Sequence, residues 1–310
     1  MGKYVLTRSL QGLLTLWLVT VAVFFLVRLT GNPINFLVSP EASPEDRQRL
    51  IEEYGFDKSY WEQYIVYNKN FLQGKFGESL RWDSRDGFEV FIDRLPATIQ
   101  LTLAAMIFSI AVGVTLGVLS ATNPDSLFDR VGKVVAILGQ SMPVFWVGIL
   151  MILVFAVYFK WLPAGGSIER LGYKAIILPA VTLGWLFVAA HMRIVRSSML
   201  EVLDSEYIKM IRAKGLPRRL VIWKHALKNA SIPIFTLFMV NFAQLISGAV
   251  VTETIFAWPG IGRLLVDSIF VRDFAVAQTV VFFGAGFIVA INLTVDIIYG
   301  LLDPRIRVAQ

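Results

Sequence analysis

The sequence EYIKMIRAKGLPRRLVIWKHALKN, from Glu206 to Asn229, is the most informative segment of the chain. It predicts two short basic helices joined by a sharp turn. Lys214 and Gly215 are typical of a last helical turn and the residue after it, and Pro217 suits the start of a second helix. A rigid helical hairpin can bind another protein and pass on its motion. Basic helices can also lie on anionic lipid, but that alternative does not explain the turn.

Apolar stretches flank this hairpin and recur along the whole chain. Hydrophobic residues make up 56% of the 310 residues and charged residues only 17%, against about 25% charged in soluble domains. A membrane crossing needs about 20 apolar residues, and lipid forces each crossing to be a helix. We therefore predict an all-α polytopic membrane protein. Its six transmembrane helices are predicted at Ser9–Val27, Leu95–Pro124, Val134–Phe159, Ala175–Met192, Asn229–Thr252 and Phe274–Leu302.

The positive charges are distributed unevenly between the loops. Six spans place both termini on one side, together with most of the Lys and Arg residues, among them Lys3, Arg8, Arg130, Lys133 and those between 193 and 228. The positive-inside rule then places the termini and the loop 193–229 in the cytoplasm and residues 30–94 outside. The predicted parts are 1–29, a tail and first transmembrane helix, 30–94, an external helical loop, and 95–310, a five-helix core. Topology explains the net charge of +6, so no nucleic-acid partner is expected.

Several chemistries have no sequence signature here. The chain has no Cys and only two His, which gives no basis for a cysteine-based metal site or a disulfide framework. It has no G-x-x-x-x-G-K-[ST] motif, so an ATP-driven mechanism would need a separate ATPase. We therefore predict no catalytic residue, metal or cofactor in this chain. A lone His is more often a polar contact than a ligand.

The loop 30–94 contains two predicted helices. Ser43, Pro44, Glu45 and Asp46 are typical of a helix start. In the second helix Tyr60, Trp61, Tyr64 and Phe71 recur at helical spacing. Two hypotheses fit these aromatic residues equally well: a cap whose rings lie at the outer membrane interface, or a docking surface for an extracytoplasmic partner.

Polar residues inside the spans carry further hypotheses. Asn241, Gln244 and Ser247 share one face of the fifth span, where they could hydrogen-bond between helices or line a translocation path. Asp296 in the sixth span suggests either a proton relay or, as the better hypothesis, an ion pair with Arg305 or Arg307. Pro143 and Pro179 are predicted to break the third and fourth helices.

Motifs along nearly the whole chain carry a resemblance to a known family. They are Arg94–Thr98, Ser141–Trp146, Trp161–Gly166, Glu206–Leu216, His225–Ala230, Glu253–Leu264 and Leu302–Arg307, with Tyr54–Asp57 and Phe76–Leu80 in the long loop. On these motifs the chain resembles binding-protein-dependent ABC importer permeases, and most of all the first permease subunit of the dipeptide/oligopeptide family.

Two positions depart from family patterns. The general importer loop has Glu-Ala-Ala where this chain has Lys209-Met210-Ile211, as is usual in the peptide branch, which keeps an earlier acid, here Glu206. Gly31-Asn32-Pro33 replaces the frequent Gly-Asp-Pro.

The resemblance implies a type I ABC importer permease fold in a bacterial or archaeal cytoplasmic (inner) membrane. It implies a second homologous permease, two ATP-binding subunits that hold ATP and Mg, and an extracytoplasmic solute-binding protein, with di- or oligopeptides or related small solutes as substrates. The residues it assigns to ATPase coupling are Glu206, Tyr207, Arg212, Ala213, Lys214, Gly215, Leu216, His225 and Asn229.

Two other classes of function compete with this one. An ion-coupled secondary transporter or channel would use Asp296 and internal repeats. The long outer loop and the shorter inner loop have no counterparts elsewhere in the chain, which disfavours a repeated half. The other class is a membrane scaffold for a cytoplasmic enzyme.

Overall fold

The computed structural model describes residues 2–29, 43–53, 55, 57–79 and 81–302. Throughout these residues the secondary structure is helical, apart from an isolated bridge between Glu78 and Asp86. The prediction of an all-α protein is therefore confirmed. Several predicted features lie outside the described residues, namely Gly31-Asn32-Pro33, Tyr54, Phe56, Leu80, Arg305, Arg307 and the side chain of Asp296.

Helices long and apolar enough to cross a membrane account for the predicted spans. Among the described residues four single helices qualify: Leu6–Leu26, Gly87–Thr122, Ile168–Leu203 and Phe274–Val295. Two bent pairs also qualify, Leu127–Gly139 with Val144–Tyr158, bent by 110°, and Arg218–Asn229 with Ser231–Ser247, bent by 60°. If each bent pair is one span the number is six, and each span overlaps one predicted stretch.

The bend in the third span lies where the sequence has proline. Helix α6 (Leu127–Ser141) ends one residue before Met142, whose backbone is extended at φ −95° and ψ 125°. Pro143 then caps α7 (Val144–Met151), which continues into the π-helical turn η1 (Ile152–Tyr158). Proline disfavours a helical conformation in the residue before it, so the bend follows from Pro143.

The predicted break at Pro179 is wrong. Pro179 lies in the first turn of α9 (Ile177–Leu203), which runs on without interruption. The first turn has no intrahelical acceptor for its N–H groups, so a proline there removes no hydrogen bond. The helix is preceded instead by a short helix α8 (Ile168–Leu171) and a 3₁₀ turn η2 (Gly172–Ile176).

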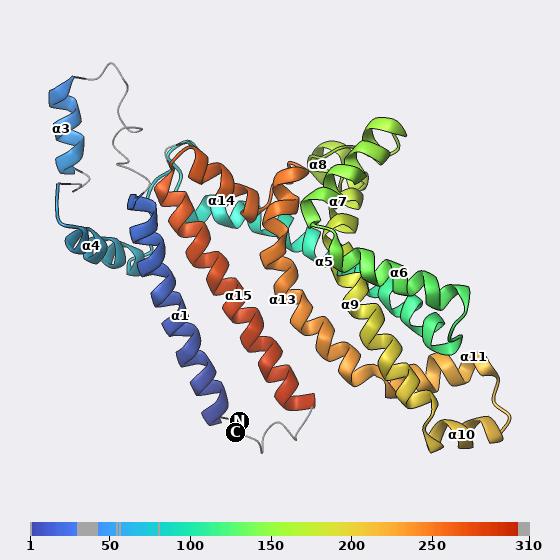
Figure 1. The fold of residues 1–310 in the computed structure, drawn as a ribbon. Helices are drawn as coiled ribbons and strands as arrows, with labels where there is room; N and C mark the ends of the chain where they lie inside the picture. Colours follow the sequence, from blue (N-terminus) through green and yellow to red (C-terminus); the bar gives the residue numbers. More distant parts are fainter. Residues whose placement is uncertain (1, 30–42, 54, 56, 80, 303–310) are drawn as a thin grey trace. The chain divides into compact units, whose positions relative to one another are not determined.

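The chain forms two compact units, one of which is Met1–Pro96 with Gly260–Leu293. Its elements are α1 (Gly2–Leu29), α3 (Pro44–Glu53), α4 (Tyr60–Leu72), the start of α5 (Gly87–Thr122), α14 (Ile261–Phe270) and most of α15 (Phe274–Leu302). Its core is Val90, Phe91, Ile261, Leu264, Val276 and Val280. Helices α1 and α15 lie side by side, since a Cβ on Gly12 would come within 2.7 Å of Val289 (Figure 1).

The second unit is Ala97–Pro259 with Thr294–Gln310. Its central helix is α9, which packs against α6, α7 and α13 (Ser231–Ile255). Helix α5 approaches α9 through glycines: a Cβ on Gly113 would lie 2.6 Å from His191, and one on Gly117 would lie 2.7 Å from Val195. Small residues allow this closeness, which lets membrane helices pack backbone to backbone.

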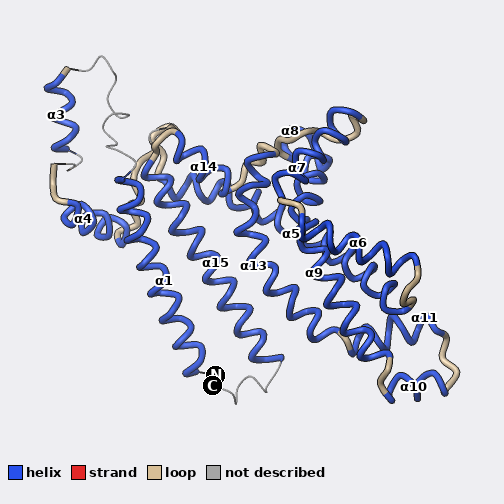
Figure 2. The backbone as a smooth tube through the Cα atoms, in the orientation of Figure 1, coloured by secondary structure: helices blue, strands red, loops and turns tan. Residues whose placement is uncertain are grey.

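The hairpin that the sequence predicted stands at the end of α9. It consists of α10 (Glu206–Ala213), then α11 (Arg218–Leu220), the π-helical turn η3 (Val221–Ala226) and α12 (Leu227–Asn229). Figure 2 shows the loop between α10 and α11 as a tan segment, beyond the end of α9. From here on, "the hairpin" means Glu206–Asn229.

Candidate functional site

Helix α10 is amphipathic and turns its apolar side inward. Ile208 and Ile211 are buried in the main core cluster of the second unit, while Tyr207 and Met210 are about half exposed. Lys209 pairs with Glu206 across one turn at 2.9 Å. Burial of the two isoleucines fixes the helix against its unit and leaves the opposite side, with the predicted residues Glu206, Arg212, Ala213 and Lys214, exposed.

The turn after α10 has the predicted geometry. The N–H of Lys214 donates to the carbonyls of Arg212 and Met210. Gly215 has φ +77°, and a Cβ there would meet nothing within 4 Å. Glycine adopts this left-handed conformation without the steric cost that other residues carry. Leu216 is half-buried beside the turn, and Pro217 precedes α11 as its cap.

The two halves of the hairpin are joined by side chains as well as by the turn. The hydroxyl of Tyr207 lies 3.2 Å from Nδ1 of His225. Asn229 donates from Nδ2 to the carbonyl of His225 at 2.9 Å. Val221 and Ala226 are buried in the same core cluster as α10. The predicted residues Tyr207, His225 and Asn229 thus form one connected group.

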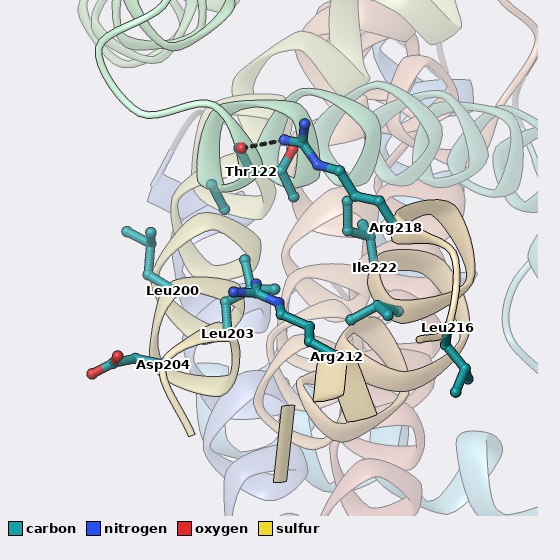
Figure 3. A pocket seen from close by; sticks show the side chains of 10 residues that line it. Thr122, Leu200, Leu203, Asp204, Arg212, Leu216, Arg218 and Ile222 are labelled. Atoms are coloured by element: carbon teal, nitrogen blue, oxygen red, sulfur yellow. Dashed lines mark hydrogen bonds between the residues drawn. The ribbon is translucent and has the colours of Figure 1, made fainter. Parts of the chain in front are cut away.

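A pocket of about 620 Å³ lies between the hairpin and the ends of α5 and α9. Figure 3 shows Arg218 reaching across it to Thr122, to whose carbonyl its Nη2 donates at 2.9 Å. The same Nη2 lies 3.1 Å from Oδ1 of Asn123. The hairpin is therefore tied to the last residues of α5. The other lining residues are Ala121, Leu200, Leu203, Asp204, Arg212, Leu216, Val221 and Ile222.

A buried carboxylate near the start of α6 was not predicted from the sequence. Asp129 is fully buried. Its Oδ1 accepts from Arg196 Nε at 2.9 Å and its Oδ2 lies 2.8 Å from Lys133 Nζ. The hydroxyl of Ser120 also donates to it. The only available signal was the pattern of charges around 120–133, because Arg196 lies 67 residues away in sequence.

The three path candidates on α13 have different surroundings. Asn241 is buried, and its Nδ2 lies 3.0 Å from Nε2 of His191 on α9. Gln244 and Ser247 are exposed in this chain. Asn241 therefore forms a hydrogen bond between α13 and α9. The side chains of Gln244 and Ser247 are available to face a translocation path.

The four aromatic candidates on α4 also divide into two groups. Tyr60 and Trp61 are exposed, Trp61 by 65%, whereas Tyr64 is only 9% exposed. The hydroxyl of Tyr64 lies 3.0 Å from Thr20 on α1, and its ring makes an edge contact with Phe24. Phe71 packs within a group of rings that comprises Phe76, Phe282 and Phe283. Of the four, Tyr60 and Trp61 are the ones available to a partner.

Arg28 adds a polar link between the ends of α1 and α4. Its Nε donates to Gln63 at 3.0 Å, and its guanidinium lies 3.4 Å from the centre of the Phe24 ring. Burial lowers the pKa of Arg28 to about 10. The guanidinium remains charged at neutral pH and orients α4 on α1.

Within the described part of the chain no group of three or more His, Asp or Glu residues could hold a metal ion.

The family model for the inner membrane component of binding-protein-dependent transport systems matches residues 113–308, which include the hairpin. The chain belongs to this family. A dipeptide transport permease of Alkalihalophilus pseudofirmus is 39% identical over 99% of this chain and 100% of its own. A di/tripeptide transport permease of Pseudomonas aeruginosa is 38% identical over 93% of this chain and 94% of its own. An oligopeptide transport permease of Bacillus subtilis is 36% identical over 99% of this chain and 100% of its own.

Solved structures agree with the fold of these inner membrane components. The inward-facing MetNI methionine ABC transporter has a chain that matches with a TM-score of 0.56 and 17% identity, covering 70% of this chain and 97% of its own. The predicted type I importer permease fold is therefore confirmed.

Membership of this family identifies the general role of the chain. It is a multi-pass permease subunit of an ABC importer in the inner membrane, and a transport subunit rather than an enzyme. The competing hypotheses of a secondary transporter, a channel and a scaffold are set aside by this result. The family implies ATPase and binding-protein partners.

Proposed function

We propose that this permease carries di- or oligopeptides inward and is driven by a separate ATPase through the hairpin Glu206–Asn229. It would enclose the path with a second homologous permease. Two ATP-binding subunits, which hold ATP and Mg, would dock from the cytoplasm, and a soluble binding protein would deliver the substrate from outside. The names of the relatives support peptides as the substrate class.

The observation that carries the coupling role is the construction of the hairpin. Its inner side is anchored in the core through Ile208, Ile211 and Val221, and its outer side is exposed and basic around Lys214. A push on such an element moves the helices to which it is anchored. ATP binding would favour one arrangement of the spans over the other, because a ligand shifts an equilibrium by its differential affinity for the two states.

Among the polar residues of α13, Gln244 and Ser247 are the proposed path residues. Both are exposed in the isolated chain, so a second permease that encloses the path would face them across it. Asn241 would contribute indirectly, by holding α13 against α9.

The orientation can be tested by labelling, because the chain has no native cysteine. We expect both termini and residues 193–229 in the cytoplasm and residues 30–94 outside. A cysteine introduced at Ser84 should react with an impermeant thiol reagent on intact cells, and one at Ser205 should react only after the membrane is opened. The unmodified protein is the blank. The reverse pattern would contradict the orientation.

The transport role is tested in proteoliposomes that contain this permease with its partner permease, ATPases and binding protein. Uptake of a labelled dipeptide should require ATP and stop when the ATPases are omitted. Uptake of labelled methionine and of labelled glucose is measured in the same way, to test alternative substrates. ATP-dependent uptake of a different solute would overturn the substrate class and leave the ATP-driven mechanism intact.

A further inference from the structure

The hairpin and the buried carboxylate of Asp129 both make polar contacts with the last turn of α5, whose backbone joins the two contacts. Arg218 leaves the hairpin and donates to the carbonyl of Thr122, the last residue of α5. Ser120, two residues earlier, donates to Asp129 on α6. Asp129 in turn is bound by Arg196 on α9. We call these four residues, Arg218, Ser120, Asp129 and Arg196, the polar brace.

The contact between Arg218 and the carbonyl of Thr122 is suited to transmit movement from the hairpin to α5. The last carbonyls of a helix have no intrahelical partner, so Arg218 satisfies a group that would otherwise require water. A cation is also favoured at a helix C-terminus by the helix dipole. Asn123 Oδ1 accepts from the same guanidinium nitrogen at 3.1 Å, which fixes the direction of the side chain.

At the other end of the brace both oxygens of the Asp129 carboxylate have hydrogen-bond or ion-pair partners. Arg196 binds it through two nitrogens, Nε to Oδ1 at 2.9 Å and Nη2 to Oδ2 at 3.3 Å. Lys133 and the N–H of Asp125 bind Oδ2 at 2.8 and 3.1 Å. A carboxylate held by two cations, a hydroxyl and a backbone N–H has one orientation, so α5, α6 and α9 are held in fixed register around it.

Stability alone does not account for such a group. Burying an ion pair costs desolvation free energy, and apolar residues of similar volume often stabilise a fold as well or better. What the ion pair provides is a defined geometry between the helices that it joins. Asp129, Arg196 and Ser120 all lie in the second unit, as the hairpin does.

We propose that the polar brace transmits movement of the hairpin to α5, α6 and α9 as one rigid body, with Arg218 and Asp129 as positioning residues for coupling. This inference rests on the proposed role of the hairpin as the ATPase handle. Without the brace the hairpin would move on its own, and ATP would be hydrolysed with less transport.

The experiment measures peptide transported per ATP hydrolysed in proteoliposomes of the complete importer. Arg218→Ala should leave ATPase co-purification and binding-protein-stimulated hydrolysis within about twofold of wild type. It should lower the transport-to-hydrolysis ratio by about fivefold or more, because hydrogen bonds to charged groups commonly change an equilibrium by about tenfold. Arg218→Lys, which keeps the charge but donates less directionally, should restore part of the ratio.

Arg130→Ala is the matched control. Arg130 follows Asp129 on α6 and is exposed, and its side chain forms no hydrogen bond or ion pair with any residue that the structure describes. It should keep the wild-type ratio. An unchanged ratio in Arg218→Ala would overturn the brace and leave the importer function standing. Loss of ATP dependence in the wild type would instead overturn the proposed function.

Asp129→Asn tests the other end of the brace, because it keeps the shape and removes the charge. It should also lower the ratio while hydrolysis continues. If this variant does not reach the membrane, Ser120→Ala replaces it, since this change cuts the contact between α5 and the carboxylate and leaves the ion pair with Arg196. A wild-type ratio in the variant that is measured would remove Asp129 from the proposal.

Discussion

The hairpin Glu206–Asn229 and the aromatic helix α4 are both proposed as surfaces for partners, yet they are constructed differently. The hairpin exposes most of its predicted residues because its geometry is set locally, by Gly215 at φ +77° and the adjacent Pro217. Helix α4 exposes only part of its aromatic face, because Tyr64 and Phe71 are drawn onto other helices. Turn chemistry can be derived from a few neighbouring residues, whereas the direction of a side chain depends on what lies opposite it.

The largest effect is expected from Gly215→Asp. A residue with a Cβ in the left-handed region costs about 1–2 kcal/mol, and the added charge would face the partner. We expect normal membrane insertion, reduced ATPase co-purification and loss of uptake.

Gly74→Asp is the matched control for this change. Gly74 has φ +76° and, like Gly215, has space around it, since a Cβ added there would meet no atom within 4 Å. Both changes therefore carry the same backbone strain, and only the location differs. If Gly215→Asp keeps full uptake, or if Gly74→Asp abolishes ATPase co-purification equally, the hairpin is not the coupling element.

Tyr64→Ala should destabilise α4 on α1. Removing a buried aromatic side chain commonly costs about 3–5 kcal/mol, and the contact with Thr20 would be lost as well. We expect a lower melting temperature of the purified protein and faster proteolysis within residues 60–72. Tyr60→Ala, at an exposed position of the same helix, should leave both measurements unchanged.

Trp61→Ala should weaken binding-protein-stimulated ATPase activity by several-fold without loss of stability. Aromatic residues frequently dominate interface energetics, and Trp61 is 65% exposed. Leu72→Ala, on the same helix and 87% exposed, is the control for loss of apolar area. Unchanged stimulation of the ATPase by the binding protein in Trp61→Ala would favour the other hypothesis, that this side of α4 forms a cap at the outer membrane interface.

The smallest effect is expected from Tyr207→Phe. It removes one hydroxyl, which lies 3.2 Å from His225, and a hydrogen bond of this kind contributes about 0.5–1.5 kcal/mol. ATPase co-purification should fall by about two- to tenfold, whereas Tyr173→Phe, at a residue that is 82% exposed, should not change it. An equal fall in both would show that the contact between the hairpin's halves does not matter.

The sequence was most informative where the deciding residues are neighbours. The six apolar stretches, the bend at Pro143 and the turn at Gly215 all follow from short-range rules on hydropathy and backbone conformation. Pro179 shows the limit of these rules. A proline is tolerated in the first turn of a helix and breaks or kinks the helix when it lies in the middle, and the start of α9 could not be predicted to within one turn.

The candidate site was predictable only in part, for a similar reason. The contact between Tyr207 and His225 bridges 18 residues and lies within a predicted hairpin. The contacts of Asp129 with Arg196 and of Arg218 with Thr122 bridge 67 and 96 residues. Charge counting assigned Arg196 and Lys133 to the same side of the membrane, but it could not show that both bind one carboxylate.

The π-helical turn η3 (Val221–Ala226) has a consequence for how this chain can change in length. A π turn holds one residue more than an α-helix needs for the same advance. Deleting one residue from it would leave an α-helical turn of the same advance, so the residues after it would keep their direction. The same deletion within α13 would rotate the rest of that helix by about 100°. The hairpin can therefore lose one residue in η3 without re-aiming the entry into α13.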